Sequence, residues 1–112
     1  MARDAAARRW KGSVPVFAAL GDETRLHVVA RLCDEGPLSI VRLTEGTELS
    51  RQAMTKHLQV LAGAGLVRGE KAGRENVFRL EPHRLGEARR LLDQISRDWD
   101  DTLERLRAFV ES

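Results

Sequence analysis

The stretch from Leu49 to Leu61 has the spacing of a short helix with two unlike faces. When residues are placed at about 100° intervals around a helix, six mostly apolar residues fall on one arc, with Leu58 at its margin. This inner set is Ala53, Met54, His57, Val60, Leu61 and Ala64. The opposite arc contains no acidic residue and consists of Arg51, Gln52, Thr55, Lys56 and Gln59. Arg and Gln can form paired hydrogen bonds with base edges, and Thr and Lys single contacts with bases or phosphates, so this outer face predicts a DNA recognition helix.

Two helices are predicted earlier in the chain. The first runs from Val14 to Leu20 and ends at Gly21. The second is capped by Asp22 and stops at the breaker pair Gly36-Pro37. Its apolar residues recur at helical spacing, which predicts one buried face. That face consists of Leu26, Val29, Ala30 and Cys33, with Val28 and Leu32 beside them.

A third, short helix is expected from Ile40 to about Glu45, with Ser39 as its cap. A turn through residues 46–48 then leads to the recognition helix, for which Ser50 is the expected N-cap. Two short helices joined by a tight turn, the second polar and basic on its outer face, indicate a helix-turn-helix. The free backbone N–H groups at the start of the second helix suit a DNA phosphate.

Beyond the recognition helix, which Gly63 and Gly65 end, alternating residues predict strands over 66–71 and 74–80 with a turn at 72–73. Residues 50–80 hold six basic and two acidic side chains, a net charge of +4, whereas the whole chain has +2. A basic hairpin directly after a helix-turn-helix is typical of a wing that reaches a minor groove or the backbone. The predicted DNA-binding residues are Ser50, Arg51, Gln52, Thr55, Lys56, Gln59, Lys71 and Arg74.

A long last helix is predicted after Pro82, with apolar residues every three or four positions. The stripe is too long for so small a core to cover, so an interface is favoured over an ordinary core-facing helix. A two-fold dimer would also pair the recognition helices, as a palindromic site requires. The expected interface residues are Leu92, Ile95, Trp99, Leu103, Leu106 and Phe109.

The whole pattern predicts a mainly α fold: a winged helix-turn-helix with five helices and a two-stranded wing, dimerising through its terminal helices. Residues 1–12 form a basic N-terminal arm, either a solvated tail or a phosphate contact, in which Trp10 is expected to pack onto something. Residues 13–112 form the DNA-binding and dimerisation domain. Without an apolar run of about 18 residues, a signal-like N-terminus or a cysteine pair, the chain is expected to be cytoplasmic with no membrane partner.

Four segments between Val14 and Leu80 carry specific patterns: FAALGDETRL at 17–26, GPLS at 36–39, LSRQAMTKHL at 49–58 and LAGAGLV at 61–67. Together they resemble the ArsR family of bacterial transcriptional regulators, and the closing helix lies where that family has its dimerisation helix. The resemblance implies a winged-helix homodimer, usually a repressor, that binds an operator and is released by a signal. Glu48 replaces the usual turn glycine and Gly46 interrupts a usually continuous helix, so the resemblance does not fix the length of the third helix.

Many members of that family sense metals, through a Cys-x-Cys pair in the third helix or through Asp and His ligands on the last helix. This chain has no cysteine between 38 and 45 and no histidine between 85 and 112. Neither a metal site nor a cofactor is therefore predicted. Cys33 is interpreted as a small core residue, with thiol or metal sensing as the alternative, although its acidic neighbours disfavour a reactive thiolate. His57 is interpreted as a partly buried histidine under the recognition helix.

The sequence disfavours two other classes of protein. An enzyme is not predicted, because the chain has neither a glycine-rich phosphate loop nor a nucleophile–histidine pattern. A winged-helix module that binds protein is the alternative of another class, and it is disfavoured by the acid-free outer face and the basic wing. The inducer, the operator sequence and the regulated genes are not encoded in any pattern of this sequence.

Overall fold

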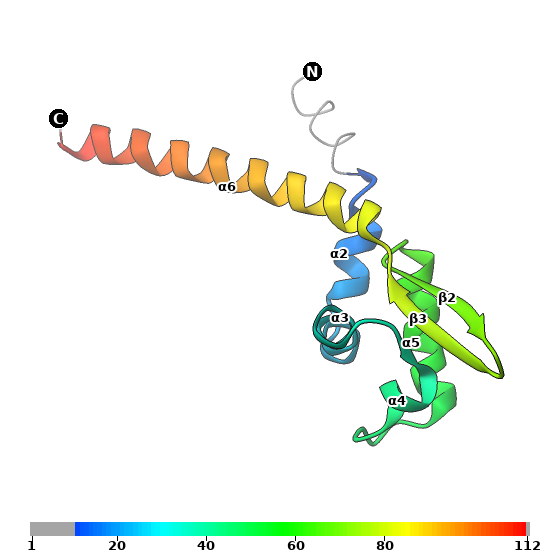
Figure 1. Ribbon diagram of the computed structural model, residues 1–112. Coiled ribbons are helices and arrows are strands. Elements are labelled where there is room, and N and C mark those ends of the chain that lie inside the picture. Colours follow the sequence, from blue (N-terminus) through cyan, green and yellow to red (C-terminus); the bar gives the residue numbers. More distant parts are fainter. Residues whose placement is uncertain (1–10, 112) are drawn as a thin grey trace.

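The computed structural model of the protein describes residues 11–111, which form a winged helix-turn-helix with a long terminal helix (Figure 1). The predicted mainly α fold with five helices and a wing is confirmed for this part of the chain. Most of the predicted N-terminal arm, including Trp10, lies outside the described residues. The elements are α2 (Val14–Leu20), α3 (Glu23–Glu35), β1 (Leu38–Ser39), α4 (Ile40–Thr44), α5 (Arg51–Gly63), β2 (Val67–Ala72), β3 (Glu75–Leu80) and α6 (Pro82–Glu111).

Three helices begin where short polar side chains predicted them to begin. The side chains of Asp22, Ser39 and Ser50 each accept a hydrogen bond from the backbone N–H three residues further along, at 3.0, 3.2 and 3.1 Å. Such bonds satisfy donors that a helix leaves without partners in its first turn. Helix α4 is short because Gly46, with φ +79°, turns the chain soon after Thr44.

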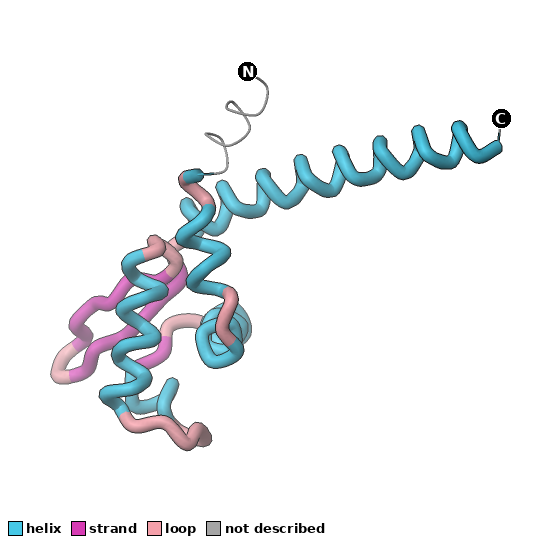
Figure 2. The backbone as a smooth tube through the Cα atoms, turned by 180° about the vertical axis from the view of Figure 1, so that it is seen from behind, coloured by secondary structure: helices cyan, strands magenta, loops and turns pink. Residues whose placement is uncertain are grey.

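The sheet has one strand more than the predicted hairpin. Strand β1 pairs antiparallel with β3, through Leu38 opposite Phe78, so the strand order is β1-β3-β2. Two residues are too few to show the alternation that marks a strand in a sequence. The extra strand ties the start of α4 to the base of the wing, and the hairpin runs beside α5 (Figure 2).

The core lies where α5 meets the other helices and the sheet. Its largest fully buried side chains are Val16, Val28, Leu43, Met54, Leu58, Leu61 and Leu66. The buried face of α5 is rotated around the helix axis relative to the predicted inner face. Leu58, expected at the margin, is 1% exposed, whereas Val60 is 45% exposed. Burial is centred on Met54, Leu58 and Leu61, and Val60 lies about 120° from that centre.

The predicted buried face of α3 was rotated in a similar way. Val29 is buried as predicted, but Leu26, Ala30 and Cys33 are exposed, and Val28 and Leu32, expected beside that face, complete the buried side. Both sets have helical spacing, so periodicity alone could not choose between them. The interpretation of Cys33 as a core residue is therefore incorrect.

Helix α6 leaves the rest of the fold after its first turns (Figure 1). Ala88 is its buried residue within the described chain, and every position from Ile95 to Glu111 is exposed. Thirty residues of α-helix span about 45 Å. Despite this length, none of the described helices is apolar enough over a sufficient stretch to cross a membrane.

Helix α5 ends in a Schellman motif. The N–H of Gly65 donates to the carbonyl of Ala62, and the N–H of Leu66 donates to that of Leu61, both at 3.0 Å. Gly65 adopts φ +77°, and a Cβ there would lie 2.6 Å from Cγ of Arg84 in α6. The turn that leads from the recognition helix to the wing thus requires glycine for two independent reasons.

We expect Gly65→Ala to lower the free energy of unfolding by about 1–3 kcal/mol, because alanine is strained at positive φ and also collides with Arg84. Gly63→Ala is the matched control, since a Cβ at Gly63 has no atom within 4 Å and its φ is not positive. That variant should be neutral or slightly stabilising. Urea unfolding followed by circular dichroism measures both, and equal effects of the two substitutions would contradict the assignment.

Candidate nucleic-acid interface

The outer face of α5 is presented as the sequence predicted. Arg51, Gln52, Lys56 and Gln59 are all exposed, while Met54 on the opposite side of the helix is 1% exposed. Arg51 and Lys56 have no ion pair with any described residue, so their charges are available to a partner. We call Arg51, Gln52, Lys56 and Gln59, together with Thr55, the reading face.

Thr55 is the exception within the reading face. It is half-buried, and its Oγ1 donates a hydrogen bond of 2.7 Å to the carbonyl of Arg51. The hydroxyl proton is therefore engaged within α5, and the oxygen is left as an acceptor. A base edge contacted by Thr55 would have to supply the donor.

Ser50 is exposed at the start of α5, where its Oγ is occupied by the N–H of Ala53. The first N–H groups of a helix have no carbonyl partner inside the helix. Because the Ser50 side chain caps only the N–H of Ala53, the N–H groups of residues 51 and 52 remain as donors at the N-terminal end of α5. This is suitable geometry for a phosphate oxygen.

The wing divides its basic residues between two faces. Arg68 and Arg79 lie opposite each other in the strand register. A guanidinium nitrogen of each lies close to a carboxylate oxygen of Glu70, at 3.9 and 3.6 Å. Lys71 lies opposite Asn76 on the other face, the one that carries the core-packed ring of Phe78. The acidic side chain thus partly neutralises the outer face, whereas Lys71 keeps its charge free of any described carboxylate.

The tip of the wing is a tight turn. Gly73 adopts φ +66° between the two strands, and the neighbouring Arg74 is exposed. Lys71, Arg74 and the exposed Asn76 therefore lie together at the far end of the hairpin. Sequence reasoning missed Asn76, because a single polar residue in a strand has no motif and only the strand register places it opposite Lys71.

His57 faces inward, as predicted, and joins a polar cluster under the recognition helix. Its Nδ1 lies 3.7 Å from Oδ2 of Asp22 and 3.4 Å from Nη1 of Arg25. The pKa of Asp22 is lowered, chiefly because its carboxylate accepts the backbone N–H of Arg25, with the positive charge of Arg25 adding to the effect. We call Asp22, Arg25 and His57 the polar cluster.

A second arginine of α3 holds the first helix of the helix-turn-helix. Arg31 donates to the carboxylate of Glu35 at 2.8 Å and to the carbonyl of Arg42 at 3.0 Å. The hydrogen bond with Glu35 raises the pKa of Arg31 and lowers that of Glu35. The contact ties α4 to α3, and both helices pack against α5.

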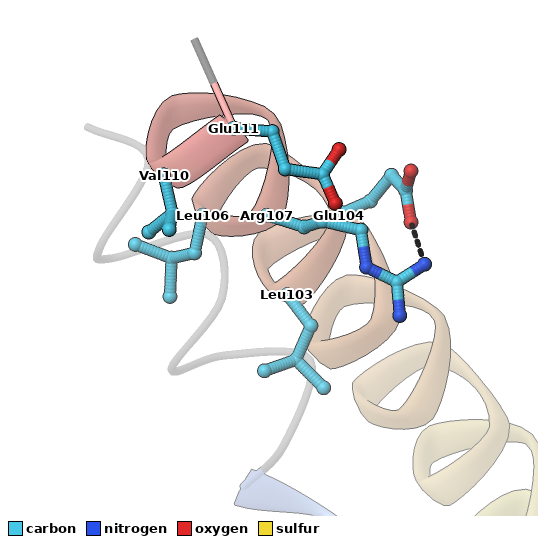
Figure 3. A pocket seen from close by; sticks show the side chains of 6 residues that line it. All are labelled: Leu103, Glu104, Leu106, Arg107, Val110 and Glu111. Atoms are coloured by element: carbon cyan, nitrogen blue, oxygen red, sulfur yellow. Dashed lines mark ion pairs between the residues drawn. The ribbon is translucent and has the colours of Figure 1, made fainter.

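The apolar side chains of α6 gather on one side of the helix. Figure 3 shows Leu103, Leu106 and Val110 projecting together, while Glu104 and Arg107 lie to the other side and form an ion pair of 4.0 Å. Leu92, Ile95, Trp99, Leu103 and Leu106 are 40–67% exposed, and Phe109 is 79% exposed. The predicted interface residues thus form one exposed stripe.

Within the described part of the chain, no group of three or more His, Cys, Asp or Glu side chains is close enough to hold a metal ion. Cys33, the residue named as an alternative sensor, is exposed on α3. His27 is also exposed on α3, whereas His57 belongs to α5 and lies in the polar cluster beside Arg25.

These features define the class of the protein: a winged helix-turn-helix that presents an acid-free recognition helix and a basic wing. A family profile described as a helix-turn-helix domain matches residues 20–70. An arsenical resistance operon repressor from Escherichia coli (strain K12) is 30% identical over 99 residues, covering 88% of this chain and 82% of the repressor. The HTH-type transcriptional regulator Rv2034 from Mycobacterium tuberculosis is 37% identical over 96 residues, covering 86% of each chain.

Among solved structures, an ArsR-like transcriptional regulator from Rhodococcus sp. RHA1 superposes with a TM-score of 0.72 at 36% identity, covering 87% of this chain and 91% of the other. The chain belongs to the ArsR family of winged-helix transcriptional regulators. The named relatives are regulators and not enzymes, which agrees with the class predicted from the sequence.

Because the pKa of Asp22 is lowered in the folded protein, its carboxylate stabilises the fold above the ordinary value of 3.8, and that contribution is lost as the pH falls through the folded pKa. Asp22→Asn keeps a good N-cap but removes the charge. We expect the free energy of unfolding of the wild type to fall more steeply below pH 3.8 than that of the variant. Urea unfolding at a series of pH values measures this, and parallel curves for the two proteins would be the contrary result.

Proposed function

We propose that the protein is a homodimeric repressor that binds a palindromic DNA operator through α5 and the wing. The observation that carries the proposal is the acid-free, exposed reading face, which lies on a helix whose other side is anchored in the core. Repression is supported by the similarity to a protein named as an operon repressor. A regulator works where its DNA is, so we also propose a cytoplasmic location.

Within this proposal the residues divide by chemistry. Arg51 and Gln52 have side chains that can bond a base edge at two points, so they are assigned to reading sequence. Thr55 and Gln59 supply further contacts along the same groove. Positively charged groups and free N–H groups position the protein on phosphates without reading sequence, and these are Ser50, Lys56, Lys71 and Arg74.

The dimer is proposed from the apolar stripe of α6. Leu92, Trp99 and Leu106 recur every seven residues, and Ile95, Thr102 and Phe109 recur with the same period three positions later. Such a repeat is the pattern by which two helices pack along a shared seam. Its one polar member, Thr102, donates its hydroxyl proton to the carbonyl of Asp98 at 3.0 Å, so burial in a seam would leave this donor satisfied.

A protein-binding module remains the competing class. It would be expected to expose an apolar or mixed-charge surface on α5, whereas the reading face is polar and free of acids. The two functions differ in their response to salt. Binding to DNA through several phosphate contacts weakens log-linearly with salt concentration, and binding to a protein surface has no such fixed slope.

We expect Arg51→Ala and Gln52→Ala to reduce discrimination between the preferred duplex and other sequences by about 1–3 kcal/mol each, because each loses a paired base contact. Lys56→Ala and Arg74→Ala should instead weaken all duplexes about equally and reduce the salt slope by about one. Arg90→Ala, at an exposed position on α6, is the control. Fluorescence anisotropy with selected and scrambled duplexes gives both quantities. An unchanged sequence preference in the Arg51 and Gln52 variants would refute their assignment as base readers.

Trp99→Arg places a charge in the middle of the proposed seam, and we expect it to convert the dimer into a monomer. Asp101→Arg is the matched control, because residue 101 lies on the opposite side of α6 and the variant adds the same side chain. Sedimentation velocity separates the two forms. A monomeric wild type, or a dimer that tolerates both substitutions, would exclude this seam.

A further inference from the structure

We propose that Arg25 is a positioning residue that, through His57, sets the orientation in which α5 presents its reading face. The inference rests on the proposed DNA-binding function and deepens it, because it names the contact by which the rest of the protein controls that face. Neither Arg25 nor His57 is assigned to DNA, and both lie on the inner side of α5.

Arg25 joins three helices through one guanidinium group. Its Nε donates to the carbonyl of Ala19 at 2.6 Å, and its Nη2 donates to that of Ala18 at 3.4 Å. Both carbonyls belong to the last turn of α2, where a positive charge is favourable. Its Nη1 lies 3.4 Å from Nδ1 of His57 in the middle of α5. The side chain springs from α3, on the face that also buries Val28 and Leu32.

The chemistry of the contact requires an arginine. A guanidinium group has only donors, so Nδ1 of His57 acts as the acceptor in this arrangement. The planar fork directs donors toward α2 and α5 at the same time, whereas a lysine ammonium concentrates its charge at one point. The carboxylate of Asp22 fixes the backbone of Arg25 by accepting a 3.0 Å hydrogen bond from its N–H.

The fold of α5 does not depend on this contact alone. Met54, Leu58 and Leu61 are at most 1% exposed and anchor the helix to the core by themselves. The polar cluster lies to one side of that apolar anchor. Loss of the guanidinium should therefore allow α5 to rotate or tilt about the anchor without unfolding the domain.

The contact also connects the reading face to the base of α6. Phe17 and Leu20 of α2 line one apolar groove with Leu85 and Leu92 of α6. A change in how α6 packs would shift α2, and with it the two carbonyls that hold Arg25. Through His57, which is adjacent to Lys56, that shift reaches the reading face. A route from the proposed dimer layer to the reading face is thereby built from the packing of α2 on α6 and from hydrogen bonds of 2.6–3.4 Å.

The test compares two DNA probes for each variant: a duplex enriched by the wild type from a randomised library, and a scrambled duplex of the same base composition. Arg25→Lys should lower the ratio of the two affinities about tenfold, because base contacts depend on the orientation of α5 and phosphate contacts do not. The affinity for the scrambled duplex, the melting temperature and the sedimentation coefficient should stay close to the wild-type values. Arg90→Lys is the control for the loss of a guanidinium at an exposed site.

A second pair of variants tests the same contact from α5. His57→Asn keeps an acceptor near the position of Nδ1 and should retain the ratio, whereas His57→Leu should lose it as Arg25→Lys does. Because the two partners act as one unit, Arg25→Lys combined with His57→Leu should cost no more than either alone. A wild-type ratio in Arg25→Lys, multiplying effects in the double variant, or equal behaviour of His57→Asn and His57→Leu would each overturn the inference. A wild type that enriches no duplex would overturn the proposed function itself, and the inference with it.

Discussion

The burial of one side of α5 is the interaction on which the rest of the structure depends. Met54, Leu58 and Leu61 lie at helical spacing and are almost completely removed from solvent, each contributing about 1.5–3 kcal/mol. Because a helix anchored along one narrow stripe keeps its opposite arc free, the same packing that stabilises the domain exposes Arg51, Gln52 and Lys56. Stability and the proposed DNA contacts therefore use different sides of one element, and substitutions can separate them.

Much of the fold could be predicted because local chemistry determined it. The caps at Asp22, Ser39 and Ser50 and the glycine at 65 fix where helices begin and end, and each depends on residues within a few positions. The features that were predicted wrongly or missed depend on contacts between residues far apart in the sequence. Strand β1 exists only because β3 pairs with it, and the buried side of α3 is chosen by what packs against it, not by its own periodicity.

The candidate interface divides along the same line. Exposure of the reading face followed from the polarity of its residues, but the back-bonded hydroxyl of Thr55 and the register of Asn76 opposite Lys71 required coordinates. The polar cluster was beyond sequence reasoning, since Arg25 and His57 are 32 residues apart. The wheel geometry turned His57 inward, and the identity of its partner had no local signal.

If α6 pairs with a second copy of the chain, as proposed, the protein becomes sensitive to its own abundance. From Ile95 onward the residues of α6 are exposed, and helices in proteins draw most of their stability from the packing of an apolar face. The order of α6 then follows mass action, because association supplies the missing apolar contacts and dilution removes them. If a second copy of the chain covers α6, a fall in protein concentration dissociates the dimer. Its two reading faces are then no longer held together for one DNA site. The amount of protein in the cell would itself set a threshold for occupancy of the DNA, before any small-molecule signal acts.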